Sequence, residues 1–261
     1  CGVVRIWDAA AALLERVLAS PDDARIIGLD PCGRLLAVGP WDTYTPRSLL
    51  LFDLAAPASA EPLPLVGTED PYLHRLNFSP EGSWLGSAHG FGLVLWNLEP
   101  ERSIVVGRQG PPRVNVAFTP DGHLLSASQE GVLRSWPLAA AAPDGMRELW
   151  SRAGADLYAI LEVAADGRFV VVGDEYEGNL VEVPLDGTPP SIHSVMRPQG
   201  ERFFARQAKL DPSGRLLAIS GELGDSLLQS TRVLDLATGA ERTLETRPEG
   251  EERCEEPGTQ Y

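Results

Sequence analysis

The chain has 261 residues and a net charge of −15, from 22 basic and 37 acidic side chains. This balance argues against a nucleic-acid partner, which needs clustered Lys and Arg to displace counterions, and it favours partners of positive charge. The three cysteines have neither metal-ligand spacing nor an even disulfide framework, and no apolar run reaches the length of a membrane span. We therefore expect a cytoplasmic protein that does not contact membranes.

Five similar turns recur along the chain, and their glycines are between 40 and 49 residues apart. In four of them Pro sets the first corner, and in all five we expect Gly to adopt the positive φ that a tight hairpin requires. A period of this length predicts a stacked array of repeats. The turns are Asp30–Gly33, Ser79–Gly82, Thr119–Gly122, Ala164–Gly167 and Asp211–Gly214.

Short apolar runs on both sides of these turns predict strands. In chain order, residues 2–19 hold two strands, and strands near 24–30, 34–39, 48–54 and 61–67 follow. The segments 73–107, 113–152, 157–196 and 202–246 each hold four more. Four short antiparallel strands in every unit is the plan of a propeller blade.

A bulky residue closes the third strand of each unit. These residues are Phe52, Trp96, Trp136, Val183 and Leu234, with Trp7 as an additional one at the start. Their spacing predicts that they pack between blades. We assign six aromatic residues to the core: Trp7, Phe52, Phe78, Trp96, Phe118 and Trp136.

The segment Phe118–Trp136, FTPDGHLLSASQEGVLRSW, resembles a WD40 repeat, and Phe78–Trp96 and Val4–Asp8 resemble one too. The resemblance implies a β-propeller that serves as a scaffold. The Trp-Asp pair of the family is complete only at Trp7-Asp8, and Glu130 stands where the family has a buried Asp, as Glu177 does in a later unit. We therefore expect the hydrogen-bonded tetrad of such repeats to be incomplete.

The predicted fold is all-β: a WD40-like β-propeller of four-stranded antiparallel blades, with about five and a half blades and an incomplete ring. We expect the remaining blades to come from flanking sequence. The Arg/Ala-rich repeats also resemble propellers appended to bacterial serine/threonine kinases. The expected parts are a half-blade at 1–19, blades at 20–67, 68–107, 108–152, 153–196 and 197–246, and an acidic disordered tail at 247–261.

The sequence offers little for catalysis. The four histidines have no zinc-ligand spacing, and His89–Gly92 lacks the Gly-x-Ser-x-Gly partner of an esterase oxyanion loop. The acids at 174–177 are typical of a solvated turn. We expect no catalytic residue, cofactor or metal. A propeller hydrolase or lactonase is the less favoured alternative, since it needs acids or histidines converging on the channel.

Aromatic and acidic residues share the segments that would lie at one end of the propeller. Aromatic side chains among polar groups are effective anchors for a protein partner, although local packing within long loops would also explain them. We predict a non-catalytic scaffold that binds a protein or peptide, in particular a basic one; the alternative is the sensing propeller of a larger bacterial signalling enzyme such as a kinase. The predicted partner-binding residues are Trp41, Asp42, Tyr44, Glu69, Asp70, Tyr72, Phe91, Asp174, Glu175 and Tyr176.

Overall fold

The structure is a computed structural model, and it contains five four-stranded antiparallel sheets and one two-stranded sheet. Among the residues it describes, no helix is long and apolar enough to cross a membrane. The described residues are 2–8, 10–20, 24–40, 49–57, 59–65, 73–89, 92–98, 101–107, 114–138, 145–157, 160–174, 179–194, 203–223 and 228–244.

Consecutive strands pair within each sheet, so every connection inside a sheet is a hairpin. The two-stranded sheet is β1 (Gly2–Asp8) and β2 (Leu13–Ser20). The next sheets are β3 (Ala24–Leu29), β4 (Leu35–Pro40), β5 (Leu49–Asp53) and β6 (Leu63–Leu65), then β7 (Leu73–Phe78), β8 (Trp84–His89), β9 (Gly92–Leu98) and β10 (Glu101–Gly107). The third is β11 (Val114–Phe118), β12 (His123–Ser128), β13 (Val132–Pro137) and β14 (Arg147–Ser151). The last two are β15 (Ile160–Val163), β16 (Phe169–Asp174), β17 (Asn179–Pro184) and β18 (Ser191–Ser194), then β19 (Phe203–Leu210), β20 (Leu216–Leu223), β21 (Leu228–Asp235) and β22 (Glu241–Leu244).

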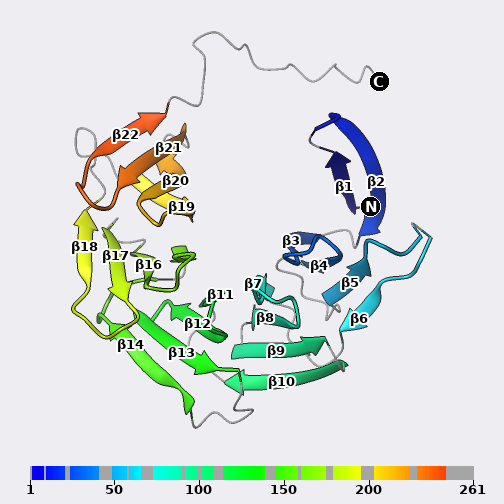
Figure 1. Cartoon of the computed structure of the whole chain (residues 1–261), viewed down its shortest axis with the longest axis horizontal. Helices are drawn as coiled ribbons and strands as arrows, with labels where there is room; N and C mark the ends of the chain where they lie inside the picture. The colour runs from blue at the N-terminus through cyan, green and yellow to red at the C-terminus, as the bar shows by residue number, and fades with distance from the viewer. Residues whose placement is uncertain are drawn as a thin grey trace, which may run out of the picture.

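The sheets stand around a common centre, as Figure 1 shows. The first strand of each four-stranded sheet is innermost, and the inner strands β3, β7, β11, β15 and β19 contact one another in that order. The described strands leave the ring open between β19–β22 and β1–β2. The prediction of an all-β fold built from four-stranded antiparallel sheets in an open ring is therefore confirmed.

Each layer of core lies between two neighbouring sheets. Between β7–β10 and β11–β14, for example, Leu93 and Leu95 pack with Phe118, Leu124 and Trp136. Every one of these five side chains is at least nine-tenths buried. Burying a side chain of this kind contributes roughly 1.5–3 kcal/mol, so each sheet depends on the sheets beside it for its stability.

Glycines permit the close approach of the inner strands. A Cβ at Gly28 of β3 would lie 2.2 Å from Leu76 Cδ1 of β7, so a larger residue would displace that side chain. In the turns the predicted conformation is confirmed: Gly33, Gly82, Gly122, Gly167 and Gly214 all have φ between 69° and 82°. An L-residue with a side chain rarely adopts this region.

The core assignments are confirmed with one clear exception. Phe52, Trp96, Trp136 and Phe118 are buried, and Phe78 is half-buried. The assignment of Trp7 is wrong, because its side chain is 58% exposed. The bulky residue of each complete sheet packs against the preceding sheet, and no described strand stands before β1 to cover Trp7.

Candidate interaction surface

The sheets present two different ends. The turns between first and second strands lie together at one end, which we call the turn end. Turns of neighbouring sheets are close there: a Cβ at Gly82 would lie 3.7 Å from Asp30 Oδ2, and a Cβ at Gly167 would lie 3.4 Å from Pro120 Cδ. Because the strands are antiparallel, connections from second to third strands, and from one sheet to the next, leave from the opposite end. We call this second end the loop end.

The predicted partner-binding residues belong to segments whose flanking strands finish at the loop end. Asp174 is the last residue of β16 and pairs with Asn179 of β17. The strand ends Pro40 and Leu49 flank one segment, and His89 and Gly92 flank another. Nine of the ten residues lie outside the described residues: Trp41, Asp42, Tyr44, Glu69, Asp70, Tyr72, Phe91, Glu175 and Tyr176. Their role as a site stays a prediction.

One connection at the loop end is described in full, and it is closely packed. The Gly131 N–H donates to Ser128 O at 3.0 Å, and the Gly131 carbonyl accepts from Arg152 N at 2.8 Å. Ser128 O also accepts from Leu157 N at 3.3 Å. The segment that leads to the next sheet thus lies directly on the β12–β13 turn. Gly131 has φ +75°, and a Cβ there would lie 2.0 Å from Arg152 O.

The acidic residues at this connection differ from the family pattern. Glu130, at the position where the family has a buried Asp, is exposed. The buried acid is Asp156, which is 2% exposed and follows Ala155 in the packed segment. Sequence reasoning missed Asp156, because its burial depends on how the segment folds back over the turn.

Two of the bulky tryptophans keep a polar link to the neighbouring strand. Trp96 Nε1 donates to Ser87 Oγ at 3.0 Å, and Ser87 Oγ is 2.9 Å from His89 Nε2. Trp136 Nε1 donates in the same way to Ser126 Oγ at 2.9 Å. These buried bonds tie the third strand of each sheet to its second strand.

Each of the last two sheets also holds a close pair of titratable side chains between its third and fourth strands, which the sequence pattern did not reveal. Arg232 of β21 is 1% exposed and its Nη1 donates to Glu241 Oε1 at 2.9 Å. On the facing sheet, His193 Nε2 is 3.1 Å from Glu182 Oε2. Arg232 lies two residues before Leu234, the bulky residue of its third strand. The equivalent residues in the other complete sheets are Leu50, Val94, Arg134 and Val181. The alternation of residues along a strand does not show whether this position holds an aliphatic side chain or a buried, ion-paired arginine.

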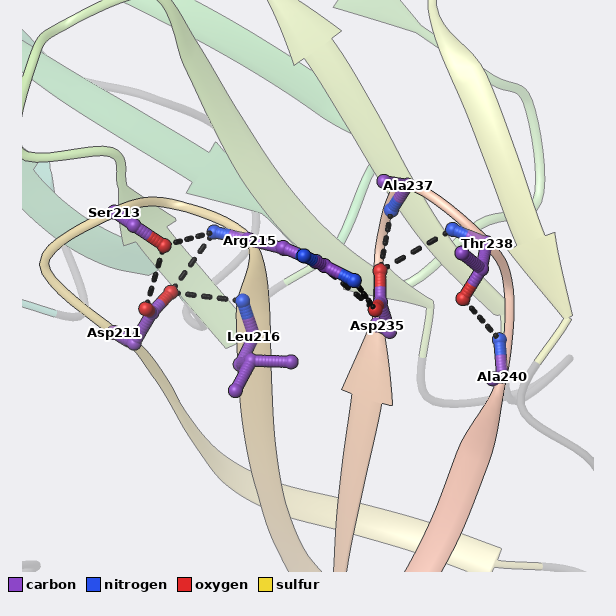
Figure 2. A network of polar contacts seen from close by, with 8 residues as sticks. All are labelled: Asp211, Ser213, Arg215, Leu216, Asp235, Ala237, Thr238 and Ala240. Carbon is purple, nitrogen blue, oxygen red and sulfur yellow. Dashed lines mark hydrogen bonds and ion pairs between the residues drawn. The ribbon is translucent and has the colours of Figure 1, made fainter.

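The turn end is fixed by carboxylates (Figure 2). Asp211 Oδ1 accepts from the backbone N–H groups of Arg215 and Leu216, both at 2.8 Å. The Arg215 side chain crosses to Asp235, with Nη2 to Oδ2 at 2.7 Å. Asp235 Oδ1 in turn accepts from Ala237 N at 3.0 Å and Thr238 N at 3.2 Å. One arginine therefore links the two turns of the sheet.

The same link recurs in the first complete sheet, where Arg34 Nη2 is 3.0 Å from Asp53 Oδ2. The hydrogen bond from Arg34 lowers the pKa of Asp53, and that from Arg215 lowers the pKa of Asp235. Hydrogen bonds within the turns lower the pKa of other aspartates in the same way: the chief donors are the Ser213 hydroxyl for Asp211 and the Thr119 hydroxyl for Asp121. These carboxylates are ionised at neutral pH and act as turn anchors.

The described residues contain no group of three or more His, Cys, Asp or Glu side chains arranged to hold a metal ion. Every resolved shift in an aspartate pKa is downward, with a hydrogen bond from a turn group or Arg as its main cause. A general acid needs the opposite environment, one that raises the pKa of its carboxyl. The six aspartates with resolved shifts, Asp53, Asp121, Asp166, Asp186, Asp211 and Asp235, are therefore in the environment of turn anchors.

Comparison with known proteins shows the fold. No protein-family model matches this chain, and no curated protein matches its sequence. The β-propeller domain of Cps50 (Swd1) from Myceliophteria thermophila superimposes with a TM-score of 0.73 at 15% identity, covering 94% of this chain and 81% of that one. The chain has the fold of a WD40-like β-propeller. In all, 965 solved chains match, so the likeness marks a widespread architecture.

Proposed function

We propose that this propeller is a non-catalytic scaffold that binds a protein partner at its loop end. The observation that carries the proposal is the architecture itself: WD40-like propellers typically serve as scaffolds for protein interaction. Here four-stranded sheets hold the ends of many connecting segments at one end of a ring. Because the strand ends are fixed before binding, little conformational entropy is lost when a partner docks.

The contrast between the two ends supports the loop end as the binding surface. At the turn end, Asp53 and Asp235 form ion pairs with Arg34 and Arg215 of the same chain, and these ion pairs offset their negative charges. The segments that leave the loop end bring aromatic residues together with acids in the sequence, as at Trp41-Asp42 and Glu175-Tyr176. Aromatic faces beside carboxylates favour Arg and Lys through cation–π and ion-pair contacts.

We infer that the partner presents a basic segment. The net charge of −15 favours association with such a segment at low salt, and the effect weakens as salt is added. The cysteine pattern supports a cytoplasmic location for this scaffold. The regulatory role in a larger signalling enzyme stays a prediction.

The test is a selection of random displayed peptides against the immobilised protein, followed by fluorescence-anisotropy titration of the enriched peptides. We expect enrichment of Arg- and Lys-containing sequences. Trp41→Ala, Tyr72→Ala and Tyr176→Ala should each weaken their binding, by ~2 kcal/mol where the residue is a hot spot, which is about thirty-fold in Kd.

The matched control is Ile192→Ala, because Ile192 is an apolar residue, 58% exposed, on the outer strand β18 and outside the loop end. Its affinity for the selected peptides should equal that of the unaltered protein. Enrichment of acidic peptides, or equal binding by all four variants, would contradict the proposal. A drop in melting temperature in the three loop variants would instead assign these aromatic residues to packing.

A further inference from the structure

The third strand of the β11–β14 sheet holds an arginine with an unsatisfied donor. Arg134 of β13 is half-buried, and its Nη1 is fully buried. Among the described residues this nitrogen has no hydrogen-bond partner. A buried donor without a partner destabilises a fold, and the cost is greater when the group is charged. Such a group needs a physical explanation, and a bound ligand is one.

Arg134 lies in the space between two neighbouring sheets. Trp136, two residues further along β13, packs with Leu93 and Leu95 of β9. Because residues two apart share a face of a strand, Arg134 lies on the face that is directed at the β7–β10 sheet. Leu93 and Leu95 are at most 4% exposed and have no polar atom in their side chains. The third and fourth strands form the outer half of each sheet, so Arg134 lies on the rim side of this interface (Figure 1).

The residues paired with Arg134 in its own sheet do not satisfy Nη1. Ser126 lies directly opposite on β12, and its Oγ accepts from Trp136 Nε1 at 2.9 Å. Glu148 lies directly opposite on β14 and is exposed. Neither of them is a hydrogen-bond partner of Arg134 Nη1. The guanidinium therefore has an apolar wall in front of it and no acceptor beside it for this nitrogen.

The last sheet shows how an arginine at this position is satisfied. Arg232 is the equivalent residue, two positions before Leu234, and it is 1% exposed. Its Nη1 donates to Glu241 Oε1 at 2.9 Å. Glu241 belongs to the fourth strand and lies directly opposite Leu234. A carboxylate that approaches from the fourth strand therefore fits this position.

The residue at the corresponding place in the β11–β14 sheet is Met146. Ser135 pairs with Arg147, so the next step of the same register places Met146 opposite Trp136. Met146 is 42% exposed, and its thioether cannot replace a carboxylate as a charged acceptor. This sheet thus has the arginine of the last sheet without the acid that accompanies it there.

We propose that Arg134 binds a carboxylate from outside this chain, which accepts from Nη1 as Glu241 does from Arg232. We call this place the Arg134 site, defined by Arg134, Trp136 and Met146. The source of the carboxylate is either a small free carboxylate or an acidic side chain of a partner polypeptide. The inference goes beyond the loop-end proposal and concerns a different surface, so the two can fail separately.

The surroundings favour one carboxylate over other anions. A guanidinium and a carboxylate are both planar, and their charge-assisted hydrogen bonds are among the strongest in proteins. The apolar wall at Leu93 and Leu95 strengthens such a bond, because the local dielectric is low. A phosphate would bring a second negative charge near Glu148, in a chain whose net charge is already −15. The site therefore suits a ligand with a single negative charge.

The test follows the arginine Nε–H signals of the full-length ¹⁵N-labelled chain by NMR during titration with sodium acetate at constant ionic strength. The Arg134 signal is identified by its loss in Arg134→Leu, a variant that should fold because Leu50 is the equivalent residue in the first complete sheet. We expect this signal to shift saturably, with a Kd on the order of 1 mM, which is within reach of so small a ligand. Sodium chloride at the same ionic strength should not shift it.

Met146→Glu supplies the absent acid from within the chain. This variant should shift the Arg134 signal without acetate, abolish the response to acetate and raise the melting temperature by about 2–4 °C. The matched control is Ile192→Glu, which adds the same charge to a fourth strand at a side chain that is 58% exposed. Ile192 lies opposite Val181, the equivalent of Arg134, so no arginine is present to receive the new carboxylate. The control should leave the acetate response unchanged.

Two blocked tripeptides distinguish the sources of the carboxylate. Gly-Glu-Gly carries the carboxylate on a side chain, and Gly-Gln-Gly replaces it with an uncharged amide. Tighter binding of the glutamate peptide than of acetate would assign the site to an acidic side chain of a partner. Equal or weaker binding would assign it to a small free carboxylate. Either result supports a carboxylate site at Arg134.

Four outcomes would overturn the proposal. The first is no shift of the Arg134 signal with acetate or the glutamate peptide, which would leave water as the partner of Nη1. The second is an equal shift with chloride or the glutamine peptide. The third is an acetate response that persists in Met146→Glu. The fourth is a shift when residues 247–261 are removed, which would place a carboxylate of the chain's own acidic segment at the site.

Discussion

Replacing Gly131 with alanine tests how tightly the loop end is built. Gly131 has φ +75°, and a Cβ there would lie 2.0 Å from Arg152 O and 3.0 Å from Ala155 O. The left-handed conformation alone costs an L-residue about 1–2 kcal/mol. The clash is with backbone, so the segment at 152–157 must move. Moving it breaks the bonds from Arg152 N to Gly131 O and from Leu157 N to Ser128 O.

Each lost hydrogen bond costs about 0.5–1.5 kcal/mol, so Gly131→Ala should lower the free energy of unfolding by about 2–5 kcal/mol. The matched control is Gly154→Ala. Gly154 has φ +81° but nothing within 4 Å of its Cβ position, so only the conformational cost of about 1–2 kcal/mol applies. The difference between the two variants isolates the clash.

The assay is urea unfolding followed by tryptophan fluorescence, together with hydrogen exchange at the amides of Arg152 and Leu157. Gly131→Ala should speed exchange at both amides, and Gly154→Ala should leave the Leu157 amide protected. Equal losses of stability in the two variants would refute the reasoning, because they would show that the packed connection at Gly131 contributes nothing beyond the turn conformation.

Two further predictions concern the sheets themselves. Trp136→Phe removes the buried donor to Ser126 Oγ and should lower the free energy of unfolding by about 1–3 kcal/mol. Trp7→Phe, at a side chain that is 58% exposed, should change it by less than about 0.5 kcal/mol. Thermal and urea unfolding compare the two variants, and equal effects would contradict the assigned burial. The pKa of Asp235 is lowered by Arg215, so its stabilising contribution is present above about pH 4 and disappears as the pH falls through the folded-state value. Asp235→Asn should therefore be less stable than the unaltered protein at pH 7, and the gap should close in acid; a gap that persists at low pH would contradict the role of the carboxylate.

The local parts of the fold were predictable from the sequence. Pro and Gly restrict φ at the turns, and strand alternation is a property of a few neighbouring residues, so the positive φ values and the strands at 73–78 and 114–118 follow from the chain alone. The recurrence of these local units also predicted the four-stranded sheets. The candidate site was predicted only as a set of residues, nine of which lie outside the described part of the chain.

Burial was decided by the tertiary structure. Trp7 and Trp136 occupy equivalent strand positions, yet one is 58% exposed and the other 7%, because only the second has a sheet in front of it. In the same way Asp156 is buried while Glu130 is exposed. The sequence by itself determined the repeat, the turns and the order of strands, since these depend on short-range backbone preferences. Which side chains are covered depends on the neighbouring sheet, and only the assembled ring supplies that neighbour.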